Sequence, residues 1–173
     1  MAGAAANLIL LPLLVDDSGN ISVAEIAAKC RREQAKNGLA LVVIDYLQLI
    51  HTRRRKDSTR NEEIGEISRA LKLLAKELRL PVLALSQMNR LGETESPKLS
   101  HLRESGSLEQ DADNVLFIVR PALETDTSAK VMIAKQRLGP TSTVDLVFLR
   151  DVQRFECRSY ATEPPSAPAH YAT

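Results

Sequence analysis

A single acidic residue closes an uninterrupted apolar stretch in the first third of the chain: Asp45 directly follows residues 39–44. A continuous apolar run of this length indicates a strand buried on both faces, as in a parallel sheet. The carboxyl edge of such a sheet is where α/β proteins bind their ligands. A carboxylate there can hold a magnesium ion, directly or through water, beside a bound phosphate. The alternative is a strand that ends in Asp only because a turn follows, and the pattern alone leaves both interpretations open.

A polar pair follows the next apolar run. Residues 82–85 come after Pro81 and indicate a second buried strand, and Ser86 and Gln87 follow it directly. If the two strands are parallel neighbours, this pair shares the sheet edge with Asp45, where Gln87 could contact a terminal phosphate or the water that attacks it. The alternative is a strand end capped by polar side chains.

Two cations stand two residues apart at the end of a later strand candidate, as Lys135 and Arg137 on either side of Gln136. Side chains at this spacing point the same way if the strand continues. The guanidinium fork of arginine binds two phosphate oxygens at once, so the pair suits a phosphate group. A solvated strand end is the alternative.

A basic stretch lies between these motifs, with five cations within eight residues: Arg53, Arg54, Arg55, Lys56 and Arg60. Clustered cations in a loop suit the phosphate backbone of a nucleic acid. A charged surface loop is the alternative explanation.

The elements that must position these residues can be predicted from pattern. Ser22 and Glu25 have the spacing of a capping box at a helix start, and Gly38 fits the stop of that helix. A second helix is expected from about Asn61 to Arg79, because its apolar residues recur at alternating steps of three and four. These residues are Ile64, Ile67, Leu71, Leu74 and Leu78.

The remaining elements are shorter. Residues 8–15 are expected to form a strand entering the core, residues 51–60 and 88–104 loops, and residues 105–112 a short helix. Strands are expected at residues 114–119, 130–134 and 143–149. The alternation of strands and helices in the first part predicts an α/β fold with a mostly parallel sheet flanked by helices. The later strands follow one another without helices, which predicts antiparallel strands at one edge.

Composition fits one domain of an ordinary globular protein, with 173 residues, 44% hydrophobic and 26% charged. The net charge of +1 means that nucleic-acid binding must come from a local basic patch. The apolar run at residues 8–15 is too short to cross a membrane, so no membrane partner is expected. Cys30 and Cys157 suggest neither a zinc site nor a disulfide framework and are expected to be reduced, as in a cytoplasmic protein.

Taken together, these motifs resemble the motor domain of DnaB-type hexameric replicative DNA helicases, from about Leu11 to Glu156. Residues 41–49 resemble the Walker B segment of that family almost word for word. Four further segments follow in the family's order: residues 66–72, 85–90, 102–113 and 134–137, the last followed by Gly139-Pro140-Thr141. Five motifs in the right order make a chance match very unlikely.

The resemblance implies a RecA-like ATPase core that uses ATP and Mg²⁺ in a ring hexamer on single-stranded DNA. It implies that Asp45 serves magnesium and that Gln87 senses the γ-phosphate. Lys135 and Arg137 would reach into the ATP site of a neighbouring subunit, with Arg137 as the arginine finger. Arg103, Glu104 and Gly106 match the loop that grips single-stranded DNA in the ring channel, and residues 53–56 would form a second channel loop.

The chain departs from the family pattern in small ways: Leu138 stands where Asn is usual, His101 where Asp is usual, and Ser142 where Gly is usual. One absence is larger. None of the seven glycines precedes a lysine, so the sequence contains no G-x-x-x-x-G-K-[ST] phosphate-binding loop. In the family this loop, and the glutamate that activates water, lie upstream of the matching segment.

The resemblance therefore assigns residues 1–160 to the C-terminal part of a RecA-like helicase ATPase domain without its P-loop part. Residues 161–173, with three prolines and no apolar period, are expected to be a disordered tail. The chain is expected to be part of a helicase motor, either as a fragment of a longer helicase gene or as one part of a split helicase that pairs with a P-loop-bearing chain. The alternatives are a non-enzymatic ring partner that regulates such a helicase, or a RecA-like recombination ATPase. The segment from Asp45 to Gln48 argues against the last.

Overall fold

The computed structural model describes residues 11–52, 59–87, 106–120 and 126–158 of the chain. It divides into two compact units, the first made of residues 1–90 and 100–111, the second of residues 91–99 and 112–173. The expectation of a single domain stays a prediction, and the two units are described one at a time. The predicted tail at 161–173 lies outside the described residues.

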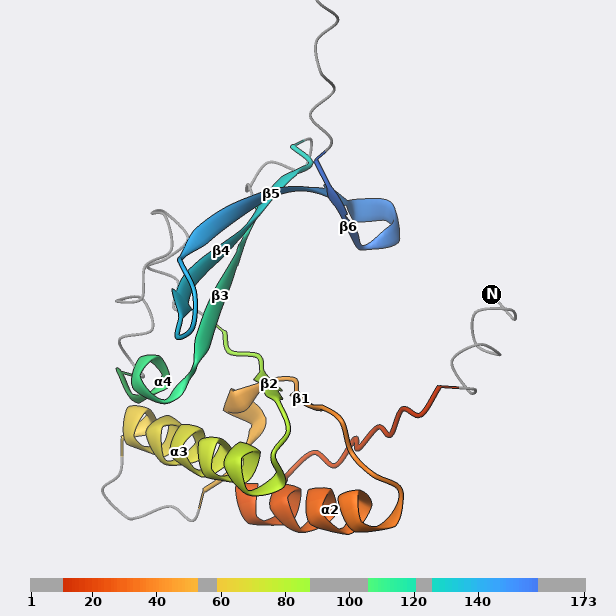
Figure 1. The fold of residues 1–173 in the computed structure, drawn as a ribbon, viewed down its shortest axis with the longest axis vertical. Coiled ribbons are helices and arrows are strands. Elements are labelled where there is room, and N and C mark those ends of the chain that lie inside the picture. Colours follow the sequence, from red (N-terminus) through yellow and green to blue (C-terminus); the bar gives the residue numbers. More distant parts are fainter. Residues whose placement is uncertain (1–10, 53–58, 88–105, 121–125, 159–173) are drawn as a thin grey trace, which may run out of the picture. The chain divides into compact units, whose positions relative to one another are not determined.

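The first unit combines helices with a parallel strand pair (Figure 1). Strands β1 (Val42–Ile44) and β2 (Val82–Ala84) pair in parallel, with Val42 opposite Val82 and Ile44 opposite Ala84. Around this pair run helix α2 (Val23–Lys36), a short 3-10 helix (Leu47–Leu49), helix α3 (Arg60–Leu78) and the short helix α4 (Gly106–Asp111). The order strand, helix, strand is the one expected of a parallel crossover.

Both long helices start in a capping box. At α2, the Ser22 hydroxyl accepts a hydrogen bond from the Glu25 N–H at 3.3 Å, and the Glu25 carboxylate accepts from the Ser22 N–H at 2.8 Å. This box is confirmed, and Gly38 follows the helix with a positive φ of 81°. At α3, Thr59 and Glu62 form the same reciprocal pair, which was not predicted. The Thr59 side chain caps this helix, which begins at Arg60, one residue before the expected Asn61.

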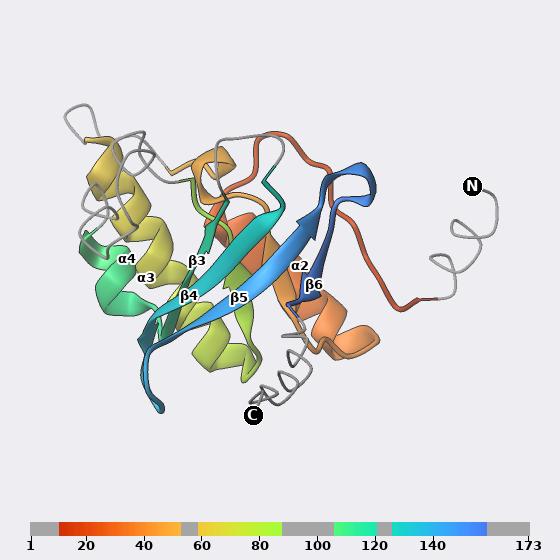
Figure 2. The ribbon, with the colours of Figure 1, turned by 90° about the horizontal axis from the view of Figure 1, so that it is seen from above.

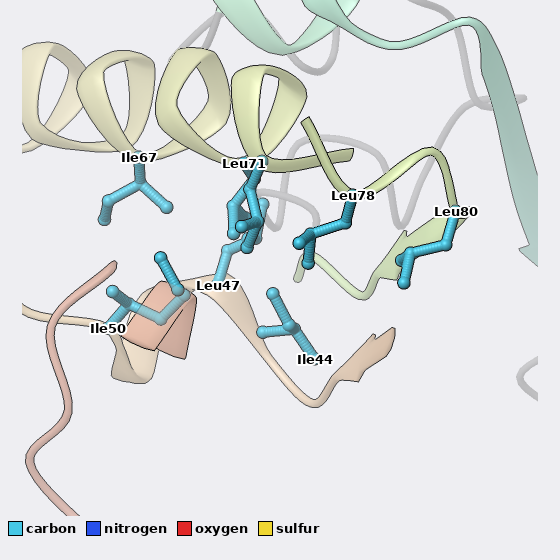
Figure 3. Packing of buried hydrophobic residues seen from close by; sticks show 9 residues of the cluster. Ile44, Leu47, Ile50, Ile67, Leu71, Leu78 and Leu80 are labelled. Carbon is cyan, nitrogen blue, oxygen red and sulfur yellow. The ribbon is translucent and has the colours of Figure 1, made fainter. Parts of the chain in front are cut away.

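The core of the first unit lies between α3 and the β1 segment (Figure 3). Residues of the predicted helical stripe point from α3 toward Ile44, Leu47 and Ile50, and Ile67 has no exposed surface. The prediction of the stripe is confirmed, because all five of its members are buried: Ile64, Ile67, Leu71, Leu74 and Leu78. This packing holds the residues just after β1 against the helix.

Polar contacts also join α2 to α3. The guanidinium of Arg31 donates to both carboxylate oxygens of Glu77, at 2.6 and 2.8 Å, and the side chain of Gln34 donates to the Leu78 carbonyl at 2.8 Å. The Arg31 fork lowers the pKa of the Glu77 carboxyl. Because the pair is exposed, its contribution to stability is small.

The strand pair is less buried than predicted. Residues 39–44 were expected to form a strand buried on both faces, but the strand covers only Val42–Ile44, and Val43 and Leu83 remain 55% and 49% exposed. Side chains alternate between the faces of a strand, and α3 covers only the face that carries Ile44. Among the described residues of the first unit no element covers the other face, which is why the prediction was wrong there.

The strand expected at residues 8–15 is absent from residues 11–15, and residues 8–10 lie outside the described residues. These residues have no regular structure, and Leu11, Leu13, Leu14 and Val15 are between 56% and 81% exposed. A strand needs a hydrogen-bonded neighbour and a surface on which to bury its side chains. Within the described part of the chain, residues 11–15 pair with no strand.

The second unit is an antiparallel sheet, with the strand order β3-β4-β5-β6 (Figure 2). Strands β3 (Asn114–Val119), β4 (Ser128–Gln136) and β5 (Ser142–Leu149) were predicted, with β4 longer than expected. Strand β6 (Arg154–Cys157) was not. A small buried set on this sheet comprises Phe117, Ala129 and Phe148.

The expected antiparallel strands are confirmed, but they form a larger share of the sheets than predicted. Among the described strands only β1 and β2 pair in parallel, while β3 to β6 form three antiparallel pairs. Connections such as residues 137–141 are too short for a parallel crossover, so consecutive strands must turn back on one another.

Both cysteines are free thiols, and partial burial raises the pKa of the Cys30 thiol. Across the described segments, no helix combines the length and the apolar character that crossing a membrane requires.

Candidate functional site

The carboxyl edge of the β1–β2 pair brings together the first two predicted motifs. Asp45 follows β1 and is exposed, and Ser86 and Gln87 lie two and three residues beyond β2. The main-chain ladder continues past the strands on both sides of Asp45: the Leu85 N–H donates to the Ile44 carbonyl and the Leu47 N–H donates to the Leu85 carbonyl, each at 2.9 Å. The polar pair therefore shares a sheet edge with Asp45, as expected.

One residue at this edge was not singled out from the sequence. The side-chain amide of Gln48 donates to the Ser86 hydroxyl at 3.1 Å and to the Gln87 carbonyl at 3.4 Å. Its side-chain oxygen accepts from the Gln87 N–H at 3.5 Å. The available signal was the position of Gln48 three residues after Asp45, inside the Walker B-like segment, but spacing alone does not reveal its partner 39 residues further on.

Gln48 is in turn bound by the start of α3. The guanidinium of Arg60 donates to the Gln48 carbonyl at 2.7 Å and to the Glu63 carboxylate at 2.8 Å. Glu63 is only 5% exposed, and a buried carboxylate needs such a partner. Arg60 was grouped with the basic stretch, but the structure uses its charge within the fold.

The cationic pair Lys135 and Arg137 lies at the end of β4 in the second unit. Lys135 is opposite Val115 in the β3–β4 pair, and the Arg137 N–H continues the ladder by donating to the Asp113 carbonyl at 3.0 Å. The strand itself ends at Gln136, so the expectation that both side chains point the same way, which required the strand to continue, stays a prediction. The Arg137 guanidinium also forms an ion pair with the Asp113 carboxylate at 2.9 Å, and its side chain stays 67% exposed. This partner was not predicted.

Most of the predicted DNA-contacting residues lie outside the described residues. This applies to Arg53, Arg54, Arg55, Lys56, Arg103 and Glu104. Gly106 is the first residue of α4. Next to it, Ser107 lies so close to Gly65 that a Cβ on Gly65 would come within 2.6 Å of the Ser107 hydroxyl. Gly65 is therefore what allows α4 to pack directly on α3.

The donor set at the Asp45 edge suits magnesium but not a whole nucleotide. Mg²⁺ prefers oxygen ligands and is usually held by one or two carboxylates together with substrate phosphates. Asp45 supplies one exposed carboxylate, and within the described residues no group of three acidic, histidine or cysteine side chains forms a complete metal site. No glycine-rich loop in the sequence could hold the β- and γ-phosphates. This edge of the sheet thus offers one exposed carboxylate to a cation, and the sequence holds no phosphate-binding loop beside it.

Comparison with known proteins agrees with this pattern. Residues 1–157 match the family described as DnaB-like helicase C terminal domain. The chain is 51% identical over 152 residues to the replicative DNA helicase DnaB of Leifsonia xyli subsp. xyli, and 46% identical over 151 residues to that of Geobacillus stearothermophilus. In both cases the match covers 83% of this chain and 33% of the relative. The chain thus spans about a third of the length of these relatives.

Two solved structures have the same fold. One is described as an ATPase domain, and it superposes with a TM-score of 0.82 at 38% identity, over 90% of this chain and 58% of that one. The other is a DnaB-like replicative helicase, studied with its interactions with primase. It superposes with a TM-score of 0.81 at 38% identity, over 89% of this chain and 39% of that one.

Proposed function

The chain belongs to the family of DnaB-like helicase C-terminal domains, and from this premise we propose that it is part of the motor of a hexameric replicative DNA helicase. Such a motor couples ATP hydrolysis to translocation on single-stranded DNA and to unwinding of the duplex. The observation that carries the proposal is the meeting of Asp45 and Gln87 at one sheet edge, in a RecA-like fold whose relatives are replicative helicases.

In this proposal each motif has one task. Asp45 holds the magnesium ion of MgATP, directly or through water. Gln87 contacts the γ-phosphate or positions the attacking water. Bound Mg²⁺ neutralises charge that develops on the phosphates. Arg137, with Lys135 beside it, reaches the ATP held by a neighbouring subunit, where its fork stabilises charge on the transferred phosphate.

DNA binding is assigned to the two basic segments. The cations Arg53, Arg54, Arg55 and Lys56, together with Arg103, contact the backbone phosphates of a single strand. Glu104 and Gly106 belong to the same DNA-contacting segment, in which Gly106, at the start of α4, has no side chain to keep the DNA backbone away. The proposed partners are therefore single-stranded DNA and neighbouring helicase subunits, and the proposed location is the cytoplasm.

A second candidate function is that of a non-enzymatic ring partner, which would present Arg137 to a neighbour and hold no nucleotide itself. A third, a RecA-like recombination ATPase, has less support, because the relatives above are replicative helicases. In another form of the first function, a separate chain bearing the P-loop would complete a composite ATP site around Asp45.

We expect the isolated chain to hydrolyse no measurable ATP, because no set of its residues can surround the β- and γ-phosphates. The measurement is phosphate release by pure protein with MgATP, with and without single-stranded DNA. Steady hydrolysis that Asp45→Ala abolishes would show that the chain builds a complete site by itself and would contradict this prediction.

We expect weak binding to single-stranded DNA without sequence preference. Log affinity should fall with log salt by about 0.7 for each phosphate contacted, because each contact releases condensed counterions. The measurement is fluorescence anisotropy of labelled oligonucleotides of different sequence at several salt concentrations. Replacing residues 53–56 by alanine should flatten the slope, whereas Lys76→Ala, which removes an exposed cation from α3, should leave it unchanged. Salt-independent binding, or a strong preference for one sequence, would refute the assignment.

A further inference from the structure

The main-chain ladder between the two parallel segments ends just before Gln87. Its last bond is the one from the Leu47 N–H to the Leu85 carbonyl. After this bond, the chain that continues β1 forms the 3-10 helix Leu47–Leu49. There the Leu49 N–H donates to the Tyr46 carbonyl at 3.0 Å, within the same segment. Within the described residues, no main-chain group of the segment that follows β1 pairs with Gln87. A contact between Gln87 and a γ-phosphate, as proposed above, needs Gln87 in a fixed position.

The side chain of Gln48 takes the place of the missing peptide group. A carboxamide carries a donor and an acceptor, as a peptide group does. The Gln48 carboxamide faces the main chain of Gln87 with both: its N–H points to the Gln87 carbonyl, 3.4 Å away, and its oxygen accepts from the Gln87 N–H at 3.5 Å. These two contacts are longer than an ordinary hydrogen bond, and the bond to the Ser86 hydroxyl at 3.1 Å anchors the group beside them.

Gln48 is itself held from two sides. Its neighbour Leu47 is 2% exposed in the core, and Ile50 closes the 3-10 helix at the same exposure. On the polar side the Arg60 fork joins the Gln48 carbonyl to the buried carboxylate of Glu63. A fork between two fixed acceptors leaves little freedom to its partners. The first turn of α3 is thus connected through Arg60 and Gln48 to the main chain of Gln87.

We propose that Gln48 is the positioning residue for Gln87, and that the Arg60–Glu63 pair holds Gln48 in place for this task. The consequence for the reaction rests on the proposed function, in which Gln87 contacts the γ-phosphate. The proposal explains why a carboxamide stands at this position. Glutamate has the same length but cannot donate, and it would turn a negative charge toward the Gln87 carbonyl, while leucine has neither donor nor acceptor.

The first test measures the order of the Gln87 main chain in the full chain by ¹⁵N NMR relaxation. In the parent protein we expect the Gln87 amide to be rigid, with an order parameter near about 0.85, and in Gln48→Glu, Gln48→Leu and Arg60→Met we expect it to fall below about 0.6. Ala84, inside β2, should stay rigid in every variant and show that the sheet remains folded. Arg32→Met, at an exposed arginine of α2, is the matched control and should leave Gln87 unchanged.

The second test measures turnover in rings assembled with a P-loop-bearing DnaB-type chain. Gln48→Glu should lower kcat by about fivefold, the factor that one net hydrogen bond supplies, with KM for ATP unchanged. Gln87→Ala tests the proposed function separately. If Gln87→Ala turns over at the parental rate, the sensor role is wrong, but a loss of order at Gln87 in the Gln48 variants still supports the positioning role. If the Gln87 order parameter is unchanged in both Gln48 variants, or if Gln87→Ala loses turnover while Gln48→Glu keeps it, the inference is overturned.

Discussion

Replacing Arg137 by alanine should remove most of the ATP hydrolysis that this chain confers on a P-loop-bearing neighbour. An arginine supplied to the ATP site of another subunit is worth on the order of a thousandfold or more in rate. Arg137 can play this part because it follows the last residue of β4 with its side chain 67% exposed. The measurement is ATP turnover in rings assembled from this chain and a P-loop-bearing DnaB-type chain.

Related variants show whether the chemistry of the fork matters. Arg137→Lys should recover little, because an ammonium ion cannot bind two oxygens in a plane. Lys135→Ala should reduce the rate in the same direction but less severely.

Arg154→Ala is a close structural control, because Arg154 is an exposed arginine of the same sheet and pairs with Glu156 as Arg137 pairs with Asp113. Exposed ion pairs stabilise little, so neither variant should disturb folding. If the Arg137→Ala ring hydrolyses ATP at the parental rate, the assignment in trans is wrong and the pair is a solvated strand end.

Asp45→Ala separates two architectures. If a P-loop-bearing chain completes a composite site with this chain, magnesium at Asp45 belongs to that site, and the variant should lose activity together with Arg137→Ala. If this chain only borders a neighbour's complete site, Asp45→Ala should keep the parental rate while Arg137→Ala does not. The comparison decides between a split enzyme and a ring partner.

Truncating Ile67 to alanine should destabilise the first unit by about 2–5 kcal/mol. Ile67 has no exposed surface, so its removal leaves a cavity between α3 and the β1 segment as well as losing apolar burial. Because a domain is stable by only about 5–15 kcal/mol, the loss is a large fraction of the total. The measurement is the urea midpoint of the helical circular dichroism signal, which reports on the first unit because all described α-helices lie in it.

Leu73→Ala on the same helix is the control. Leu73 is 61% exposed, so its truncation should change the free energy of unfolding by no more than about 0.5 kcal/mol. Equal midpoints for Ile67→Ala and Leu73→Ala would mean that the packing of Figure 3 does not stabilise the chain in solution.

The elements that depend on neighbours in sequence were predictable. The stripe from Ile64 to Leu78 follows from helical period, and the capping box at Ser22 follows from two side chains three residues apart. The end of β1 was predictable for the same reason, since an apolar run that stops at Asp45 marks the boundary within the chain itself. The family resemblance added roles for Asp45, Gln87 and Arg137, and these stay predictions.

Elements without such a signal were missed. Strand β6 has only four residues, all exposed, so its alternation of polar and apolar side chains is too short to be a reliable signal. Its pairing with β5 across a turn at Gln153, which has a positive φ of 50°, defines it. The prediction that both faces of β1 and β2 are buried was wrong although an apolar signal was present. The apolar run at residues 39–44 indicates which side chains avoid water, but not whether another element is present to cover them.

The sequence alone does not indicate which residues far apart in the chain become hydrogen-bond or ion-pair partners. Gln48 and Gln87 are 39 residues apart, and Arg137 and Asp113 are 24 apart. A hydrogen bond or an ion pair requires its two groups within about 3 to 3.5 Å in a defined direction. Only the parallel register of β1 with β2 and the antiparallel register of β3 with β4 bring these groups so close. The sequence alone therefore indicates which residue types could bind a metal ion or a phosphate. The contacts that hold Gln87 and Arg137 exist only after the strands have paired.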